Sequence, residues 1–239
     1  MTAEWSRIVD ALRKGCTGVG LDLVQPFAAA VYNRAVPPEW RIEDFGRPRA
    51  LGVLFGNTRA LWQPFLRAVA AEAELAADQH PLERYLRERL VPLVTAASDR
   101  RHRLYWAHET RPALPIQRLA ELVGLASLSP SHLSIHPQHG PWLALRAVLV
   151  LDVDGPDAPA PALESPCPAC HKPCLPALER ALGETGAELG SATIAANAGA
   201  WIAVRDACPV GRASRYGERQ LCYHYTKDRK LLRDGIDER

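Results

Sequence analysis

The chain has 239 residues, of which 47% are hydrophobic and 23% are charged, and its formal net charge is +2. These values are typical of a globular protein and exclude a disordered chain. Acidic and basic residues are mixed along the whole chain without a basic block, so nucleic acid is excluded as an expected partner.

The sequence also argues against export and membrane insertion. Residues 1–15 carry charges where a signal peptide needs an apolar core. The longest apolar run, residues 142–151, contains Arg146 and is shorter than the roughly 20 residues of a membrane-spanning helix. We therefore expect a soluble cytoplasmic protein without a membrane partner.

Hydrophobic periodicity and turn residues predict alternating helices and strands in the first half of the chain. The expected helices cover residues 1–15, 60–78, 82–94 and 116–128, the last of them ending near Gly124. The expected strands cover residues 15–24, 49–57 and 103–109. A loop is expected around the paired prolines Pro37 and Pro38.

The second half of the chain contains the clearest strand and then a change of composition. Residues 141–153 are aliphatic and β-branched, as in a buried strand. Residues 153–166 are rich in proline and alanine and are predicted to form a linker. Beyond it we expect a helix over 176–184, a short strand over 201–207 and a charged tail.

These elements predict an α+β fold with a mixed sheet. The expected parts are a core (1–152), the linker (153–166) and a C-terminal cap (167–239) that completes the fold. No G-x-G-x-x-G follows a strand, which argues against a dinucleotide-binding fold. P-loop, H-E-x-x-H and G-x-S-x-G motifs are also absent, and the sequence identifies no catalytic residue.

A cluster of cysteines follows the linker. The segment CPACHKPC contains Cys167, Cys170 and Cys174, and Cys208 is followed by Pro209. In a reducing cytosol such a cluster is more often a metal or redox site than a disulfide. Short loops between thiolates allow the sulfur atoms to converge on one metal ion.

Three states of this cluster remain open from the spacing. Zinc would be held by the three clustered cysteines with either His171 or Cys208. An iron-sulfur cluster would take Cys208 as its fourth thiolate, with Cys222 in reserve. The third alternative is an empty or degenerate site. Cys16, far from the cluster in sequence, is expected to be a buried structural thiol.

Five segments between Asp22 and Arg229 carry a family resemblance: VQPFAAAVYNRAVPPEW, RALGVLFGNTRALWQPFL, RPALPIQRLAELVGLAS, SIHPQHGPWLALRAVLVL and VRDACPVGRASRYGERQ. In this order they resemble the cobalamin-processing family of the methylmalonic aciduria and homocystinuria type C protein. The most specific pieces are YN and PP within 32–38, and IHP with G-x-W within 135–142.

The resemblance implies a nitroreductase-like α+β fold with a mostly antiparallel sheet flanked by helices. It implies that residues 1–152 bind cobalamin with its lower base displaced, and that the upper axial ligand is removed. In that family, decyanation uses electrons from a reduced flavin, so FMN or FAD is an expected cofactor. Dealkylation of alkylcobalamins uses glutathione as the nucleophile.

The resemblance also implies site residues. The cobalamin-binding positions correspond to Leu114, Pro115, Ile116, Gln117, Leu128, Ser129, Pro130, Ser134 and Leu145, with Trp142 as a candidate wall or core residue. Their mostly apolar character suits a buried macrocycle and equally suits a core. The glutathione-binding arginines correspond to Arg146, Arg205 and Arg229, and a guanidinium matches a carboxylate in a planar fork. Because Arg146 lies in an apolar strand, we expect it to have a buried partner or a ligand.

Two departures from that family concern the cobalt and the cysteines. Glu121 stands where the family's corrin-pocket helix tends to carry a histidine, which leaves the mode of cobalt coordination open. CPACHKPC, DACP and RQLCYHY resemble instead the epoxyqueuosine reductases, which are corrinoid enzymes with iron-sulfur clusters. Those enzymes place an acid just before the helix at 114–123, where this chain has Arg111, and they have a longer C-terminal part.

The sequence therefore predicts a cytoplasmic cobalamin-binding oxidoreductase that acts as a cyanocobalamin reductase and alkylcobalamin dealkylase. Glutathione or a flavin-dependent reductase would supply the electrons. Cys167, Cys170, Cys174 and Cys208 would form an electron relay or a structural zinc site. One alternative is an iron-sulfur corrinoid reductase related to the epoxyqueuosine reductases. Another is a non-catalytic cobalamin carrier with a structural zinc ion.

Overall fold

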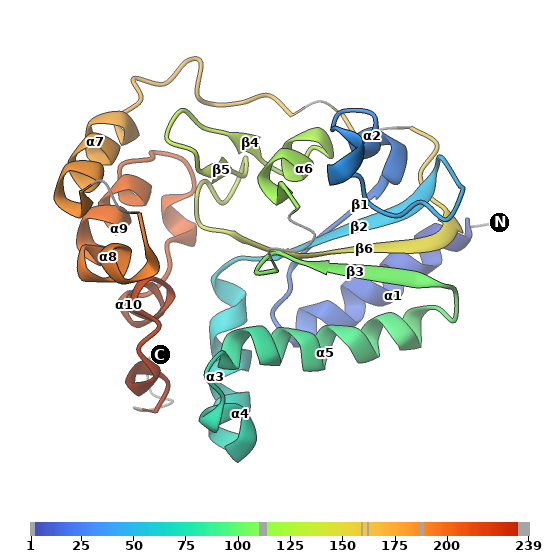
Figure 1. Ribbon diagram of the computed structural model, residues 1–239, viewed down its shortest axis with the longest axis horizontal. Helices are drawn as coiled ribbons and strands as arrows, with labels where there is room; N and C mark the ends of the chain where they lie inside the picture. Colours follow the sequence, from blue (N-terminus) through green and yellow to red (C-terminus); the bar gives the residue numbers. More distant parts are fainter. Residues whose placement is uncertain (1–2, 110–113, 159, 162, 187–188, 234–239) are drawn as a thin grey trace.

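A four-stranded sheet forms the centre of the protein in the computed structural model, which describes residues 3–109, 114–158, 160–161, 163–186 and 189–233. Its strands are β1 (Leu23–Ala28), β2 (Ala50–Asn57), β3 (His102–Trp106) and β6 (Ala144–Asp154). They lie in the order β1-β2-β6-β3 and every pairing is antiparallel (Figure 1). The α+β class predicted from the sequence is confirmed.

Helices cover both faces of this sheet (Figure 1). One face is covered by α1 (Glu4–Gly18), α3 (Trp62–Ala71) and α5 (Pro81–Ala97). The other face is covered by α2 (Ala29–Asn33) and α6 (Ile116–Leu122). Each face of the sheet packs on its helices in a separate hydrophobic core, and alternate residues of β2 belong to each. Val53 and Phe55 belong to the core on the first face, and Leu54 belongs to the core on the second. The short elements here are η1 (Pro38–Trp40), η2 (Arg59–Leu61) and α4 (Ala73–Ala77).

The C-terminal helices lie beside one end of the sheet (Figure 1). They are α7 (Cys174–Thr185), α8 (Ser191–Ala196), α9 (Ala198–Asp206) and α10 (Glu218–Thr226), with η3 (Arg212–Ser214) and η4 (Arg229–Leu232). A small hairpin of β4 (Ser127–Leu128) and β5 (Ser134–Ile135) follows α6. None of the described helices is long and apolar enough to cross a membrane.

The strand predicted over residues 201–207 is wrong, because residues 201–206 belong to α9 and Ala207 is its C-cap. Trp201 and Val204 are three residues apart, which places both on one face of a helix, and this face packs against Ala177 and Ala181 of α7. The Trp201 indole also donates to the Thr185 hydroxyl (2.9 Å). Valine and isoleucine suggested a strand, but the alanines around them favour a helix.

Two elements in the first half differ from their predicted bounds. The strand predicted over 15–24 starts only at Leu23, because α1 continues to Gly18. The helix predicted over 60–78 is divided at Glu72, whose backbone is extended (φ −119°, ψ 99°). Pro26 is accommodated in β1 because β1 is an edge strand and its missing N–H faces no neighbour.

A β-bulge interrupts β6 at Arg146. Phe55 pairs with Ala147 and the next residue, Gly56, pairs with Leu145, so Arg146 is one extra residue opposite β2. Regular alternation would place Leu145 on the same face as Ala147. Instead Leu145 packs against the core under α2 and α6, whereas Ala147 belongs to the core under α1 and α5. The bulge therefore changes the direction of the side chains at the start of β6.

Two glycines join the C-terminal helices to the rest of the protein. Gly140 (φ 56°) and Gly211 (φ 71°) both have the left-handed backbone that favours glycine. A Cβ atom at Gly211 would overlap the His139 carbonyl, and one at Gly140 would overlap the Val210 carbonyl. The close contact of these two main chains fixes the turn at 136–140 against the segment before η3.

Candidate functional site

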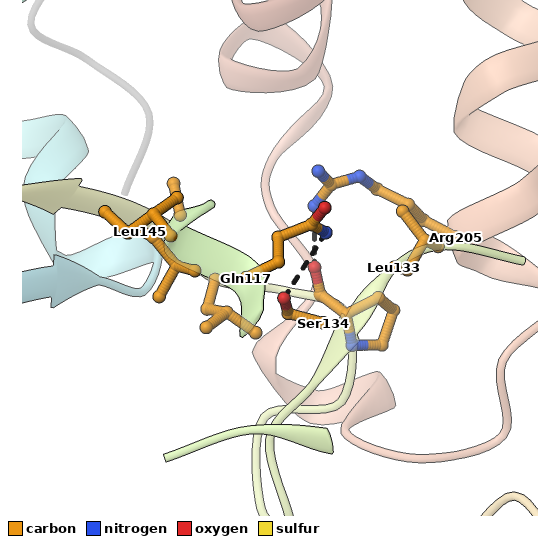
Figure 2. Close-up of a pocket in the computed structure, with 9 residues that line it drawn as sticks. Gln117, Leu133, Ser134, Leu145 and Arg205 are labelled. Atoms are coloured by element: carbon orange, nitrogen blue, oxygen red, sulfur yellow. Dashed lines mark hydrogen bonds between the residues drawn. The ribbon is translucent and has the colours of Figure 1, made fainter. Parts of the chain in front are cut away.

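An open groove lies where β6 begins, between α6, the β4–β5 hairpin and α9. Its cavity measures about 220 Å³ and is lined by Ile116, Gln117, Leu133, Ser134, Pro141, Leu143, Ala144, Leu145 and Arg205. Figure 2 shows Gln117, Ser134 and Leu145 around this space, with the Arg205 side chain reaching in from α9. The groove thus combines residues from three separate parts of the chain.

Few polar groups line the groove, and hydrogen bonds hold each of them. Gln117 Nε2 donates to the His132 carbonyl (2.9 Å) and to Ser134 Oγ (3.4 Å). Arg205 Nη1 donates to the Pro141 carbonyl (2.6 Å). An apolar lining with a few fixed polar groups is typical of sites for organic ligands, although such sites usually measure roughly 300–1,000 Å³. A large macrocycle would therefore fill the groove and extend over its rim.

A second cavity, which we term the chamber, adjoins the groove. It measures about 190 Å³ and is lined by Leu143, Ala144, Arg146, Arg205, Tyr216, Leu221, His224 and Tyr225. It shares Leu143, Ala144 and Arg205 with the groove. Because the bulge in β6 directs Leu145 to the groove and Arg146 to the chamber, adjacent residues serve different cavities.

The chamber is cationic. Arg146 Nε donates to Asn57 Oδ1 (2.6 Å), whereas its Nη2 atom is buried and has no hydrogen-bond partner within the described residues. Burial lowers the pKa of Arg146, but a guanidinium remains protonated in proteins. Burial also raises the pKa of Tyr216 to about 12 and holds the pKa of His224 well below its usual range. At neutral pH the chamber therefore contains guanidinium groups, a protonated phenol and a neutral imidazole.

The structure brings two of the three predicted glutathione-binding arginines together. Arg146 and Arg205 both line the chamber. Arg229 lies elsewhere, where its Nη1 atom donates to the carbonyls of Ala77 (3.0 Å) and Asp78 (2.8 Å) at the end of α4. A role of Arg229 in glutathione binding stays a prediction that no contact of the described residues supports.

The ten residues predicted to bind cobalamin are divided between several places. Those that line the groove are Ile116, Gln117, Ser134 and Leu145. Those that lie elsewhere are Ser129 and Pro130 in a cavity with the cysteines, Leu114 on the core under α2, Pro115 at the N-cap of α6, Leu128 at an exposed position, and Trp142 packed on Tyr216. These positions do not test the predicted role of any of the ten residues.

The four predicted metal ligands line a third cavity. Cys167 and Cys170 precede α7, Cys174 begins it, and Cys208 follows α9. The Lys172 backbone N–H donates to Cys170 Sγ (3.4 Å). Among the described residues this cavity has no lining contribution from the other two candidate ligands, His171 and Cys222. Leu133 lines both this cavity and the groove, so the two are neighbours.

The donor set of this cavity suits a metal, but its arrangement does not form a ready site. Four thiolates are the ligands of structural zinc and of iron-sulfur clusters. In the part of the chain that the structure describes, however, no three His, Cys, Asp or Glu side chains are grouped closely enough to hold a metal ion. Burial raises the pKa of Cys208, whereas a metal ion bound there would lower it by stabilising the thiolate. A metal at this position stays a prediction.

Three further residues singled out in the sequence lie outside these cavities. Glu121 forms an ion pair with Arg118 on α6, and its other carboxylate oxygen accepts from the Leu128 N–H (3.5 Å). Cys16 is fully buried in the core under α1, as predicted, and burial raises its pKa to about 12. Arg111 lies outside the described residues.

Sequence reasoning missed most of the chamber. The unpredicted lining residues are Leu133, Pro141, Leu143 and Ala144 in the groove, and Tyr216, Leu221, His224 and Tyr225 in the chamber. A signal for the chamber was present, because Leu221, His224 and Tyr225 follow the i, i+3, i+4 spacing of one helix face. The charged residues around them made this segment resemble an exposed tail.

Comparisons with known proteins identify the fold. No family model and no curated protein match the chain. A crystal structure of a C. elegans B12-trafficking protein CblC, a human MMACHC homologue, matches with a TM-score of 0.66 at 16% identity, covering 99% of both chains. Epoxyqueuosine reductase from Bacillus subtilis matches with a TM-score of 0.52 at 14% identity, covering 87% of this chain and 66% of that chain. A selenomethionine-labelled epoxyqueuosine reductase gives 0.52 at 15% identity, covering 93% and 70%.

At these identities the likeness concerns the fold alone. The two kinds of protein are those that the sequence motifs resemble, and the fold predicted from that resemblance is confirmed. The C. elegans structure matches over essentially the full length of both chains, whereas the reductases extend beyond this one. The roles of individual residues are a separate matter.

Proposed function

We propose that the chain binds cobalamin in the groove and removes its upper axial ligand. The observation that carries this proposal is the convergence of Ile116 and Gln117 from α6, Ser134 from β5 and Leu145 from β6 on one cavity. All four residues belong to segments whose sequence resembles a cobalamin-processing family. The full-length likeness in fold to a B12-trafficking protein supports the same function.

In this proposal the protein orients the macrocycle and excludes water from part of it. The aliphatic side chains of the groove bury the corrin, and Arg205, held by the Pro141 carbonyl, offers a fixed guanidinium at the rim. A reduced flavin, FMN or FAD, would supply the one electron that converts Co(III) to Co(II), and cyanide would leave with its bonding electron pair. For an alkyl ligand, the glutathione thiolate attacks the alkyl carbon and forms a thioether, while cobalt keeps the bonding pair as Co(I).

The first experiment is an absorbance measurement under anaerobic conditions. Cyanocobalamin is added to purified protein, followed by a reduced flavin, and spectra are recorded at each step. We expect base-off cobalamin on binding and base-off cob(II)alamin after reduction. Unchanged spectra over excess protein would overturn the proposal. Binding without turnover by any flavin or by glutathione would favour a non-catalytic carrier.

A second candidate function is that of a metal-containing corrinoid reductase. The observation that favours it is that Cys167, Cys170, Cys174 and Cys208 share one cavity next to the groove. Metal analysis of anaerobically purified protein should then give iron with sulfide, or zinc for a structural role. Replacing Cys170 by serine should remove the metal, whereas Cys222→Ser, outside the cavity, should retain it. Loss of reduction with intact cobalamin binding in Cys170→Ser would identify an electron relay.

A further inference from the structure

The cysteines beside the groove are arranged for a reaction that needs fewer sulfur atoms than a metal site does. In the part of the chain that the structure describes, no three side chains of the metal-binding types are grouped closely enough to hold an ion. All six cysteines of the chain are free thiols. A disulfide needs only two sulfur atoms and a suitable separation of their Cα atoms. A pair of these thiols can therefore be redox-active without a metal.

Cys167 and Cys170 are the two ends of a tight turn. The Cys170 N–H donates to the Cys167 carbonyl (3.2 Å), and this bond between residues i and i+3 closes a β-turn. Pro168 occupies the second position of the turn, where the fixed φ of proline is favourable. The end Cα atoms of a β-turn lie within about 7 Å, and disulfides join Cα atoms about 4.4–6.8 Å apart. The backbone therefore suits a disulfide between these two residues.

Hydrogen bonds fix both ends of this turn. The Cys167 N–H donates to Ser165 Oγ (3.3 Å), and the Lys172 N–H donates to Cys170 Sγ (3.4 Å). The second bond orients the Cys170 sulfur, and Lys172 has a left-handed backbone (φ 55°) that returns its N–H toward this atom. Both cysteines also line the same cavity, so their side chains face one space.

Solvent access distinguishes this pair from the other cysteines of the cavity. Cys167 and Cys170 are half-buried, and the two residues between them are exposed, so an incoming molecule can reach the turn. Cys174 is buried at the start of α7. Cys208 is half-buried, but it reaches the cavity from the end of α9, so a bridge to it would join two helices. Access and a suitable backbone thus coincide at the turn.

We propose that Cys167 and Cys170 form a redox-active dithiol that exchanges with the disulfides of small thiols. One thiolate attacks the substrate disulfide, forms a mixed disulfide and releases the first thiol. The other cysteine attacks the mixed disulfide and releases the second thiol. The protein loses two electrons and two protons, which convert the substrate's S–S bond into two thiols. Because Leu133 lines both this cavity and the groove, the couple holds two electrons beside the groove; their use on cobalamin rests on the proposed function, but the exchange does not.

Thiol counting in glutathione buffers tests this site. Reduced protein, purified without oxygen, is equilibrated over a series of ratios of oxidised to reduced glutathione and quenched with acid. Free thiols and mass are then measured on the denatured chain. As the first change with rising ratio, we expect the count to fall by two, from six to four, without bound glutathione.

Single substitutions identify the pair. Cys167→Ser and Cys170→Ser should each lack the two-thiol step, because a single cysteine of the turn can form a mixed disulfide but cannot resolve it. Cys222→Ser, at a half-buried cysteine of α10, is the matched control and should keep the step. Pro168→Gly keeps every cysteine but makes the reduced turn more flexible, so it should need a roughly threefold higher ratio.

Several results would overturn the dithiol. They are an unchanged thiol count, glutathione retained on the wild type at the first step, or a two-thiol step that persists in either turn variant. A stoichiometric iron or zinc ion that blocks the step would also overturn it and would assign the cysteines to the metal-containing reductase. Cobalamin spectra are recorded separately on the same preparation. A protein that shows the two-thiol step and ignores cobalamin would therefore refute only the proposed function.

Discussion

The groove and the chamber share a wall, yet they offer opposite environments to a ligand. The groove is open and aliphatic, and its few polar groups are satisfied by other protein atoms. The chamber is smaller, and among the described residues two of its buried donors have no hydrogen-bond partner and its arginines form no ion pair. This difference shows that the hydrogen bonds already made by a cavity's polar groups say more about its ligand than the cavity's volume does. The groove suits a ligand held by shape and apolar surface, whereas the chamber suits a ligand with a hydrogen-bond acceptor.

The largest expected effect removes both cavities together. Gly211→Ala places a methyl group in the His139 carbonyl at a left-handed backbone position, so we expect a loss of about 3 kcal/mol or more of unfolding free energy. Binding of cobalamin should weaken as well, because the Arg205–Pro141 contact at the groove depends on this junction. Chemical denaturation measures the change. Gly217→Ala, where a Cβ has open space, is the control; an equal loss there would contradict the argument.

The next effect concerns the aliphatic wall of the groove. Leu145→Glu puts a charge in this wall, and we expect cobalamin affinity to fall about a hundredfold, since burying an unpaired charge costs several kcal/mol. Spectroscopic titration measures the change. The same substitution at exposed Leu182 of α7 should leave cobalamin affinity unchanged. An undiminished affinity in Leu145→Glu would contradict a role of the groove in cobalamin binding.

Two histidines, His136 in the turn before β6 and His224 in the chamber, should make stability depend on pH. Burial, followed by repulsion from His139, lowers the pKa of His136 to about 4, and burial lowers the pKa of His224 well below its usual value. Both groups therefore stabilise the fold above about pH 6.5, and that stability is lost as the pH falls toward 4. For partly exposed His136 we expect about 2 kcal/mol. His136→Gln should flatten the profile of unfolding free energy between pH 7 and 5; an unaltered slope would assign it to other groups.

The smallest effect concerns the polar contacts of the groove. Gln117→Met keeps the side-chain length and loses the bonds to the His132 carbonyl and Ser134. Because Gln117 is exposed, we expect stability to change by about 0.5 kcal/mol and cobalamin affinity by less than about threefold. Spectroscopic titration and denaturation test this. A tenfold loss of affinity would mean that the groove recognises its ligand mainly through polar groups.

The two central strands of the sheet, β2 and β6, could be predicted from the sequence because each is a continuous apolar run, which is typical of a strand buried on both faces. The edge strand β1 is less apolar, and its prediction overlapped the structure only at Leu23 and Val24. The segment 201–207 was misassigned because β-branched residues also occur in helices that pack on a neighbour, here α7. Secondary-structure patterns do not encode such tertiary contacts.

The candidate site was predictable only in part. A charge in an apolar strand correctly marked Arg146 as a residue in need of a partner, and short spacings marked the three clustered cysteines. Cys208 reaches the cavity of the three clustered cysteines because of how α9 packs, and sequence spacing does not show this. In the same way, the packing of α10 places Arg229 at α4, away from Arg205. The partnerless hydroxyl of Tyr216 has no counterpart in the sequence at all.

The extra residue in β6 changes which residues of that strand point to which face of the sheet. After Arg146, odd-numbered residues point to the face of α1 and α5, whereas before it odd-numbered residues such as Leu145 point to the other face. If Arg146 were deleted, Leu145 and Ala147 would become neighbours, and neighbouring residues of a regular strand point to opposite faces. Leu145 would therefore keep its place at the groove, whereas the chamber would lose its central guanidinium. The insertion thus adds a charged compartment at this end of the sheet without disturbing the aliphatic one.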